Sequence, residues 1–337
     1  MFISIVAPSR NEVGRIEAFL ESVLAQDTAD LNWELIVADG MSDDGTRDIL
    51  KSYSQRDSRI RVVDNPGRIV STGLNAAIGV ARGDVIARMD IHTIYASNYL
   101  RECVAVLEAT GADNVGGPWW AVGDKGLSLA IAVAFQSRFC SGGACSHQVD
   151  YEGWADSVYL GCWKRTVFDR VGFFDPRLVR NQDDEFNLRI RKAGGSIWQS
   201  PRIVSWYSPR ESLSDLFMQY LQYGLWKVAV IRKHGLPAAW RHLVPVVFVL
   251  SLGTLLLFSL ASVVTGVPSL SSLGWALLTA EMLLYMSACL GASLKAGRHH
   301  GWRLVVYLPI VFATYHFAYG VGFVLGLLGL SSHFIRM

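Results

Sequence analysis

The stretch GLNAAIGVARGDVIARMDIH, residues 73–92, decides the fold of this chain. Its first half carries small and apolar residues that predict a helix, and the segment DVIARMD that follows predicts a buried strand. The strand ends in a carboxylate, Asp90, and His92 follows two residues later. A helix that leads directly into a buried strand is typical of a parallel sheet. The Asp-x-His pair therefore stands at the edge where such sheets bind ligands.

The same alternation of helix and strand extends over the first ninety residues. Short apolar segments alternate with segments whose apolar residues recur at helical spacing. The expected strands cover residues 2–8, 33–40, 60–66 and 84–90, and the expected helices cover residues 11–26, 42–55 and 71–82. We therefore expect an α/β fold with a mostly parallel sheet and helices on both of its faces.

The residues that end the four expected strands are candidates for one ligand site, because the carboxyl ends of parallel strands meet at one edge. They are Pro8, Arg10, Asn11, Glu12, Asp39, Asn65, Asp90 and His92. The acidic turn SDDGT lies at a helix start. Its Asp43 and Asp44 are expected to cap that helix and complement its dipole rather than to take part in chemistry.

The composition excludes some classes of function and indicates a membrane region. A formal net charge of +2 without a basic stripe argues against a nucleic-acid partner. Five scattered cysteines indicate reduced thiols, which suit a cytosolic domain. Three apolar runs, residues 243–266, 273–294 and 304–330, each exceed the roughly 20 residues that span a bilayer. We expect a soluble domain over 1–210, an amphipathic region over 211–242, and three transmembrane helices within 243–337.

The distribution of basic residues predicts the orientation in the inner (cell) membrane. The segment before the first span and the link between the second and third spans are both rich in lysine and arginine, whereas the link VPSLSS is uncharged. The positive-inside rule then places the soluble domain in the cytosol and the tail SSHFIRM outside. Glu281 and His316 lie within expected spans, where they are either functional or paired within the bundle.

Several segments, taken in order, resemble the family 2 glycosyltransferases, which have the GT-A nucleotide-sugar fold. They are SIVAPSRNE, ELIVADGMSDDGT, GLNAAIGVARGDVIARMDIH, DSVYLGCWKR and FFDPRLVRNQDDEFNLRIRKAGG, and together they cover most of residues 3–200. The basic segment QYLQYGLWKVAVIRKHG and the three apolar runs look most like membrane-bound exopolysaccharide glucosyltransferases of the succinoglycan type.

The resemblance implies a binding site for a nucleotide-sugar donor. Pro8, Arg10, Glu12 and Asp39 would line the pocket for the base and ribose, and Arg68 and Arg88 are candidates for binding the diphosphate. The metal motif of the family, Asp-x-Asp, reads Asp90-Ile91-His92 here. We expect Asp90 and His92 to hold Mn²⁺ or Mg²⁺, with manganese favoured by the imidazole. In the alternative, Asp90 binds the metal without His92.

The resemblance also implies a catalytic base and an acceptor pocket. Aligning NQDDEFNLRIRKAGG on Arg189 places the base at Asp183, with Gln182 in place of the family's first acid, and Asp184 and Glu185 are rivals. A base at Asp183 would give a single displacement that inverts the anomeric configuration. The residues expected at the sugar and acceptor pocket are Tyr159, Gly161, Trp163, Gln219 and Trp226, although the aromatic residues could instead belong to the core.

Together these features predict an inverting, metal-dependent enzyme that adds one sugar, glucose from UDP-glucose, to a polyprenyl-diphosphate-linked saccharide during exopolysaccharide or envelope glycan synthesis. The segment 215–235 would lie in the membrane interface and contact lipid headgroups, and polysaccharide assembly proteins are possible partners. The alternatives are a processive synthase, which Gln222 and Tyr223 disfavour because they replace an Arg-Trp pair, a polyprenyl-phosphate or other lipid glycosyltransferase, and an inactive nucleotide-sugar-binding scaffold.

Overall fold

The computed structural model describes residues 1–28 and 31–330, and it divides the chain into two compact units. The first unit combines Met1–Ala121 with Ala144–Ser208, and the second combines Val122–Gly143 with the chain from Pro209 onward. The sequence analysis expects an uninterrupted first domain over 1–210, followed by the regions 211–242 and 243–337, and does not foresee that residues 122–143 belong to the second unit. The expected external position of the tail concerns residues 331–337, which lie outside the described residues.

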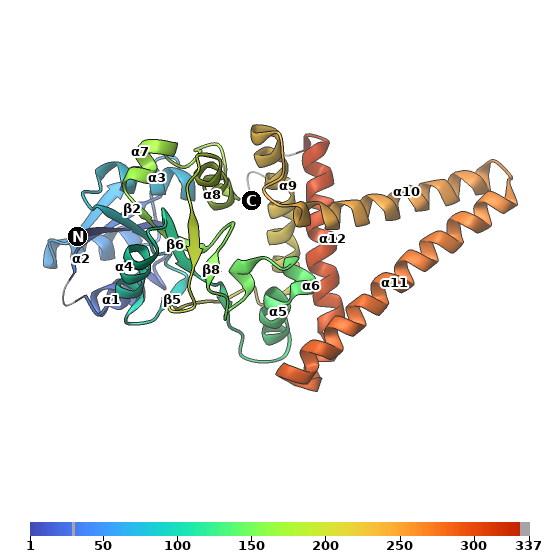
Figure 1. Ribbon diagram of the computed structural model, residues 1–337, viewed down its shortest axis with the longest axis horizontal. Helices are drawn as coiled ribbons and strands as arrows, with labels where there is room; N and C mark the ends of the chain where they lie inside the picture. The colour runs from blue at the N-terminus through green and yellow to red at the C-terminus, as the bar shows by residue number, and fades with distance from the viewer. Residues whose placement is uncertain (29–30, 331–337) are drawn as a thin grey trace. The chain divides into compact units, whose positions relative to one another are not determined.

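The first unit is built on an eight-stranded, mostly parallel sheet (Figure 1). The strand order is β3-β2-β1-β4-β9-β6-β10-β8, in which β9 runs antiparallel to β4 and β6, and β8 runs antiparallel to β10. The strands are β1 (Phe2–Ser9), β2 (Asn32–Asp39), β3 (Ile60–Asp64), β4 (Val85–Arg88), β6 (Asn114–Gly117), β8 (Gly153–Trp154), β9 (Tyr159–Lys164) and β10 (Ile197–Gln199).

Helices cover both faces of this sheet, as the alternation of strands and helices predicts. Side chains such as Ile5 and Leu35 join one hydrophobic cluster with α1 (Ile16–Leu24), α2 (Thr46–Arg56) and α4 (Tyr99–Thr110). Their neighbours Val6 and Ile36 point to the opposite face, because successive side chains alternate along a strand. There they pack with α3 (Val70–Val80), α7 (Thr166–Val171) and α8 (Gln182–Lys192).

A second sheet of three short strands lies beside the metal motif. Its order is β5-β11-β7, with β5 (Thr93–Tyr95), β7 (Trp120–Ala121) and β11 (Ser205–Tyr207). A separate 3-10 turn of the first unit, η1, covers Cys145–His147. Strand β5 begins directly after His92. The hydroxyl of Tyr95 accepts a hydrogen bond from the backbone N–H of Asp90 at 2.5 Å and donates to the carbonyl of Asp90 at 2.9 Å. The small sheet thereby fixes the backbone at the end of β4.

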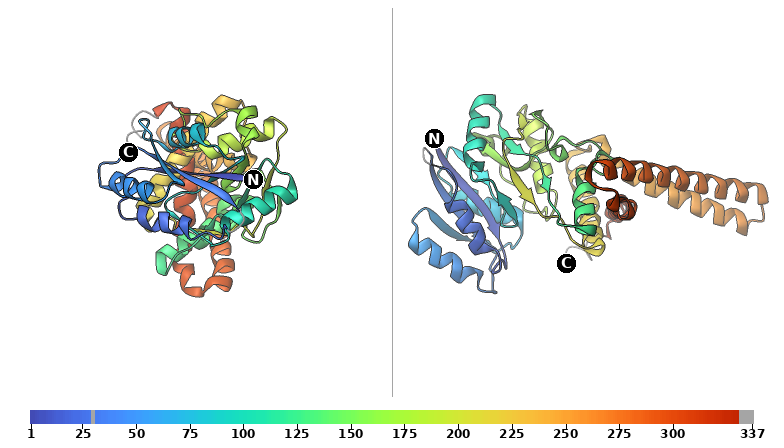
Figure 2. Two further views of the ribbon diagram at one scale, coloured as in Figure 1. Left: turned by 90° about the vertical axis from the view of Figure 1, so that its left-hand side faces the viewer. Right: turned by 90° about the horizontal axis from the view of Figure 1, so that it is seen from below.

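The second unit is helical, and three of its helices are long and apolar enough to cross a membrane: Trp240–Val264, Pro268–His300 and Leu308–Leu327. Figure 2 shows two of them as a long hairpin. The elements of this unit are α5 (Gly126–Gln136), α6 (Arg138–Ser141), α9 (Leu213–His234), η2 (Trp240–Leu243), α10 (Val244–Val264), α11 (Pro268–His300), η3 (Trp302–Val306) and α12 (Leu308–Leu327).

Helix α9, which the sequence analysis expects at the membrane interface, does not leave all of its basic side chains free to meet lipid. Lys227 is only 3% exposed. Arg232 donates a hydrogen bond from Nη2 to the carbonyl of Leu327, near the end of α12, at 2.9 Å. One face of α9 therefore packs against protein, and two of its basic residues serve that packing, which a count of charges along the sequence cannot reveal.

A buried carboxylate joins the two central strands of the first unit to the turn before β4. Glu34 is 1% exposed and accepts hydrogen bonds from the hydroxyl of Ser4 at 2.7 Å and from the guanidinium groups of Arg61 and Arg82. Burial by itself raises the pKa of Glu34, but these hydrogen bonds outweigh burial, so that the pKa is lowered.

We predict that Glu34→Gln lowers the free energy of unfolding by about 1–2 kcal/mol at pH 7, because hydrogen bonds to a charged group are lost while both arginine partners remain exposed to water. The contribution of Glu34 is present above its unfolded pKa of about 4.3 and is lost as the pH falls through the lowered folded pKa. Thermal unfolding of the detergent-purified protein at pH 7 and pH 4 measures this. Glu108→Gln, at an exposed position of α4, is the control; equal melting temperatures of the two variants at pH 7 would contradict the prediction.

Candidate active site

The carboxyl ends of β1, β2 and β4 form one edge of the sheet, and the candidate residues gather there. Strand β1 lies between the other two, with Ser9 in register with Asp39 of β2 and Val6 in register with Arg88 of β4. The sequence-predicted residues after these strands are therefore close in space because the strands are parallel neighbours. The pairing register of β1 with β2 and β4 therefore sets which of these residues are neighbours.

Asp39 provides a buried acceptor at this edge. Its side chain is fully buried, and Oδ2 accepts hydrogen bonds from the backbone N–H of Ser42 at 3.0 Å and from Arg47 at 2.9 Å. Within the described part of the chain, neither Oδ1 of Asp39 nor the hydroxyl of the adjacent Ser9 has a hydrogen-bond partner. Two buried, unsatisfied polar atoms in register are costly in a folded protein unless a ligand satisfies them. They suit the polar edge of a nucleobase.

Two of the residues at this site are absent from the sequence-based list. Arg47 links Asp39 to Asp64, at 2.9 Å and 2.7 Å, and so ties the ends of β2 and β3 together. Ser9 is the residue between Pro8 and Arg10, and its strand partner is Asp39. The sequence shows that Ser9 lies near the strand end, but only the register shows that its hydroxyl is adjacent to the buried carboxylate.

Hydrogen bonds connect the loop after β1 to the loops after β2 and β4. Asn11 donates from its backbone N–H to Ser42 at 2.9 Å and from its side chain to Asp43 at 3.0 Å. Asp44 accepts from the backbone N–H of Val13 and from Thr46, whose hydroxyl holds the pKa of Asp44 below its ordinary value. Asp43 and Asp44 therefore hold the two loops together, and the N-cap position of α2 that they are expected to fill is occupied by Gly45.

Arg88 and Asp90 form a two-pronged ion pair at the end of β4. Nε and Nη2 of Arg88 donate to the two carboxylate oxygens of Asp90, each at 2.7 Å. Arg88 is 6% exposed, and burial alone would lower its pKa. The charge and hydrogen bonds of Asp90, together with the charge of Asp183, outweigh burial and raise the pKa of Arg88. Arg88 is therefore permanently charged.

The charge of Asp183, the expected catalytic base, contributes to the raised pKa of Arg88. Asp183 is therefore a candidate for the same site. Asp183 lies in the first turn of α8, and its Oδ1 accepts the backbone N–H of Asp184 at 2.9 Å. The rival Glu185 is fully buried and forms an ion pair with Arg189 at 2.9 Å, and Arg189 also donates to the carbonyl of Phe173. Glu185 therefore anchors α8 to the preceding loop, and Asp183 is the better candidate for proton transfer.

An aromatic group borders the Arg88–Asp90 pair. The hydroxyl of Tyr159 lies 2.6 Å from the hydroxyl of Thr93, and burial followed by the charge of Asp90 raises the pKa of Tyr159. The ring of Trp119 contacts Tyr159 and Tyr207, with centroids 4.8 Å and 5.4 Å apart. Trp119 belongs to the segment GGPWW after β6. Its position beside Tyr159 makes this segment a candidate wall of the sugar pocket.

The residues of the Asp-x-His motif can contribute to a divalent cation site but do not complete one. Nε2 of His92 lies 2.7 Å from Oε1 of Glu12, so the imidazole donates this N–H and retains Nδ1 for a metal. Among residues 1–28 and 31–330, no group of three or more His, Cys, Asp or Glu side chains could hold a metal ion. The carboxylate and imidazole fit Mn²⁺ or Mg²⁺ if diphosphate oxygens supply the other ligands.

The remaining predicted residues occupy the loops around this edge or belong to the second unit. Arg10 is exposed and donates from Nη1 to the backbone carbonyl of Arg68 at 3.5 Å, so the loops after β1 and β3 meet. Pro8 is partly buried at the end of β1. Gln219 and Trp226 lie on α9, in the second unit.

Strained backbone marks the same edge. Five residues other than glycine have a φ angle in the left-handed region, which side chains with a Cβ rarely adopt: Asn11, Met41, Arg68, Leu160 and Asn181. Three of them follow β1, β2 and β3, one lies in β9, and one directly precedes α8. Such strain persists only where the surrounding structure enforces it, and it concentrates at functional sites.

Comparison with known proteins identifies the family. The family described as Glycosyl transferase family 2 matches residues 4–150. The succinoglycan biosynthesis protein ExoA of Rhizobium meliloti (strain 1021) is 34% identical over 72% of this chain and 73% of its own length. The chain belongs to glycosyltransferase family 2.

Two further relatives extend the likeness beyond the catalytic unit. The dolichyl N-acetyl-alpha-D-glucosaminyl phosphate 3-beta-D-2,3-diacetamido-2,3-dideoxy-beta-D-glucuronosyltransferase of Methanococcus voltae is 26% identical over 99% of both chains. The mannosyltransferase PcManGT from Pyrobaculum calidifontis, solved in complex with GDP-Man and Mn²⁺, has a TM-score of 0.60 at 19% identity and covers 97% of this chain and 87% of its own. This structure supports the GT-A fold of the glycosyltransferase.

Two expected pocket residues of this family 2 glycosyltransferase serve the core instead. Trp163 is 2% exposed, and its ring packs edge-on against Phe168, Phe174 and Phe186. Gly161 has a φ of 109°, and a Cβ at this position would overlap the indole of Trp163. The absence of a side chain at 161 is therefore explained by the packing of Trp163 and not by the approach of a sugar. A short aromatic motif does not show which side of the strand each ring occupies.

We predict that Gly161→Ala in this glycosyltransferase lowers the free energy of unfolding by about 2–4 kcal/mol, because the new methyl group overlaps the indole and the backbone angle becomes strained. Gly79→Ala, on α3 with no atom within 4 Å of the added Cβ, is the matched control and should not destabilise. Thermal unfolding compares them. A Gly161→Ala protein that melts normally but transfers no sugar would restore the pocket interpretation.

Proposed function

We propose that this family 2 glycosyltransferase is an inverting, metal-dependent enzyme that transfers one sugar from a nucleotide donor to a lipid-linked saccharide. UDP-glucose is the proposed donor, and exopolysaccharide or a related envelope glycan is the proposed product. The observation that carries the proposal is the Arg88–Asp90 ion pair at the end of β4, whose buried arginine also feels the charge of Asp183.

The donor would occupy the edge formed by β1, β2 and β4. Its base would satisfy Oδ1 of Asp39, which accepts an N–H, and the hydroxyl of Ser9, which can donate or accept. Arg10 and Arg68 would stand near the diphosphate, since their loops meet beside this pocket. The N3–H of a uracil ring is a suitable donor to this carboxylate oxygen, as the proposed uridine nucleotide requires.

Asp183 would act as the general base. As the acceptor hydroxyl oxygen attacks the anomeric carbon, its proton passes to the Asp183 carboxylate, and the bond from that carbon to the phosphate oxygen breaks. The electron pair leaves with the nucleoside diphosphate. The single displacement inverts the configuration, so an α-linked donor gives a β-linked product.

Asp90 and His92 would hold the divalent cation. When bound, such a cation neutralises the charge of the diphosphate. Arg88 keeps the Asp90 carboxylate in a fixed orientation by two hydrogen bonds, and Glu12 does the same for His92 by one. A mannosyltransferase of the same fold was solved with GDP-Man and Mn²⁺, so this fold can bind a nucleotide sugar together with a divalent cation.

The proposed acceptor is a saccharide on a polyprenyl diphosphate, reached from the cytosolic side of the inner membrane. The Methanococcus relative acts on a dolichyl-phosphate-linked sugar by its name and forms a β linkage. The apolar helices of the second unit would keep the enzyme at the membrane that holds such lipids. Tyr159, and Gln219 and Trp226 on α9, remain candidates for acceptor contacts, and polysaccharide assembly proteins are candidate partners.

We predict that Asp183→Asn retains donor binding and reduces transfer by about 10²–10⁴-fold, since general base catalysis contributes this much. Donor affinity is measured by calorimetry, and transfer is measured with radiolabelled UDP-glucose and membranes that hold lipid-linked acceptors. Asp184→Asn, its neighbour in the same helical turn, is the matched control. Full turnover in the Asp183 variant would move the base elsewhere, and wild-type protein that binds the donor but neither transfers nor hydrolyses it would indicate a scaffold.

A second prediction concerns the cation. His92→Ala should weaken binding of Mn²⁺ in the presence of UDP by about 10-fold or more, and Glu12→Gln should weaken it less, because the amide can still accept the imidazole N–H. Electron paramagnetic resonance of free Mn²⁺ measures this without turnover. Glu17→Gln, on the neighbouring helix α1, is the control. Unchanged Mn²⁺ affinity in His92→Ala would leave Asp90 as the protein's own ligand without His92.

A further inference from the structure

Helices α9 and α12 of the second unit form a close pair that runs in the same direction. Along α9, Tyr220, Gly224 and Arg232 meet Tyr315, Tyr319 and Leu327 of α12 in turn, and Leu221 meets Gly322. Ring centroids of Tyr220 and Tyr315 are 4.3 Å apart, a Cβ on Gly224 would overlap the carbonyl of Tyr319, one on Gly322 would overlap the carbonyl of Leu221, and Arg232 binds the carbonyl of Leu327. Glycine on both helices brings the backbones together. The pair lies side by side in Figure 1.

The parallel direction of this pair restricts how the chain can cross a membrane. Helices that cross a bilayer one after another alternate in direction. If α9, α10, α11 and α12 all crossed, α9 and α12 would be antiparallel, whereas their contacts make them parallel. The four helices therefore cannot all be transmembrane, and if α10 and α11 both cross, at least one member of the α9–α12 pair does not.

A crossing by α12 alone conflicts with the pairing. The contacts keep residues 220–232 of α9 beside residues 315–327 of α12, over about 20 Å at the rise of a helix. If α12 crossed, the end of α9 would be carried across the bilayer with it. The chain would then have to return to the start of α10 through residues 235–243, which include Arg241 and non-helical backbone. Such a segment cannot cross hydrocarbon.

The position of α12 against the hairpin leads to the same conclusion. A Cβ on Gly320, in the second half of α12, would overlap Val249 and the carbonyl of Pro245, which lie in the first two turns of α10. The ring of Phe317 contacts Phe248, with centroids 5.3 Å apart. These contacts of α12 involve the first two turns of α10. Here α12 crosses the hairpin where α10 begins, and α10 and α11 extend away from it together (Figures 1 and 2).

The helices of the hairpin and α12 differ in how much of each helix is buried. In their most apolar stretches only 11% of α10 and 11% of α11 is buried, against 50% of α12. Protein covers α12 because Tyr315 donates to the carbonyl of Ile131 at 3.3 Å, and Phe139 packs against Phe312 at 5.1 Å. Helix α12 is therefore coated by α5, α6 and α9, whereas α10 and α11 present bare apolar side chains.

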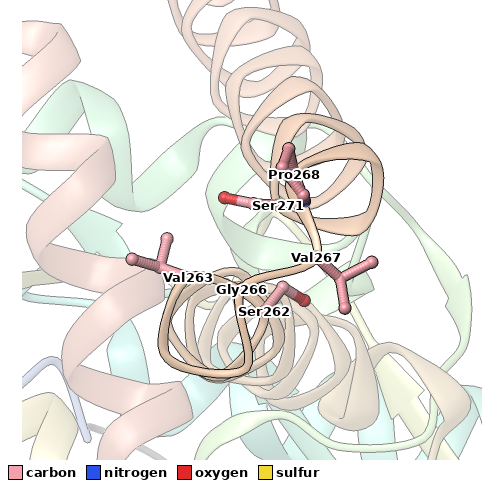
Figure 3. A pocket seen from close by; sticks show the side chains of 6 residues that line it. All are labelled: Ser262, Val263, Gly266, Val267, Pro268 and Ser271. Carbon is pink, nitrogen blue, oxygen red and sulfur yellow. The ribbon is translucent and has the colours of Figure 1, made fainter.

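The two ends of the hairpin differ in chemistry. At the end near α12, Trp240 and Trp302 are 74% and 59% exposed, and Arg241 and Arg303 are their neighbours in sequence. Exposed tryptophan with arginine is typical of the headgroup layer. The far turn holds a hollow of about 230 Å³ without a charged residue (Figure 3), lined by Ser262, Val263, Gly266, Val267, Pro268 and Ser271. An uncharged turn crosses a bilayer more readily than an end that carries arginine.

We propose that α10 and α11 alone cross the bilayer, as a hairpin, and that the pair α9–α12 lies along the headgroup layer on the side where the hairpin begins. The partner of this surface is the lipid headgroup layer. The end of α12, Leu327, then lies on the side of the bilayer where the hairpin begins. This replaces the three spans and the external C-terminus that the sequence analysis predicts, and it does not depend on the donor or acceptor.

Reporter fusions to the full chain in a bacterial host test the proposal. Alkaline phosphatase, which is active only outside the cytosol, and green fluorescent protein, which fluoresces only inside, are each fused after Met337. A phosphatase inserted at Gly266 reports the hairpin turn. We expect fluorescence at the C-terminus, at least 10-fold less phosphatase activity there than at the turn, and an active phosphatase at the turn. An active phosphatase at the C-terminus would establish a third crossing, and an inactive one at the turn would show that the hairpin does not cross; either result overturns the proposal.

Discussion

The active-site edge depends on the pairing of a buried arginine with the carboxylate that follows it by two residues. A guanidinium as buried as that of Arg88 is tolerated only when it is paired, and Asp90 pairs with it through both oxygens. The pair holds the Asp90 carboxylate in one orientation. It also places a fixed positive charge beside Asp183, so that strand β4 and helix α8 share one electrostatic centre.

A parallel sheet makes this centre accessible from three loops at once. The polar network runs from Asp39 through Ser42 and Asn11 to the loop after β1, and from Glu12 to His92. Each of these contacts joins residues at least 31 positions apart except the first, so none could form without the sheet. The Asp-x-His motif is thus supported by a carboxylate from another strand. Glu12 fixes which ring nitrogen of His92 carries the proton. This gives a physical reason why a histidine can stand where the family motif has a second acid.

Much of the first unit could be predicted from the sequence, because its strands and helices are local patterns. The four parallel strands, the helices between them and the residues at their ends follow from periodicity and from the family resemblance. The antiparallel strand β9 between β4 and β6, and the burial of Trp163, could not be predicted, because both depend on pairing between segments far apart in the chain.

The second unit shows a different limit of sequence reasoning. Length and apolarity identify α10, α11 and α12 as candidate membrane spans, but they cannot show which other parts of the protein cover each helix. The bond from Arg232 to Leu327 depends on the packing of α9 against α12, and the burial of Lys227 likewise depends on tertiary packing. Residues 122–143 also belong to this unit because of their contacts in the folded structure, although in the sequence they interrupt the first unit.

The three left-handed residues that follow β1, β2 and β3 have a consequence for the kinetics of donor association. Loops that are strained and held by surrounding contacts have already lost their conformational freedom when the chain folds. A donor that meets such loops does not need to order them, so its arrival should be a single bimolecular step whose rate depends on diffusion and on the charge of the edge. A slow unimolecular phase after mixing would point to motion elsewhere in the enzyme.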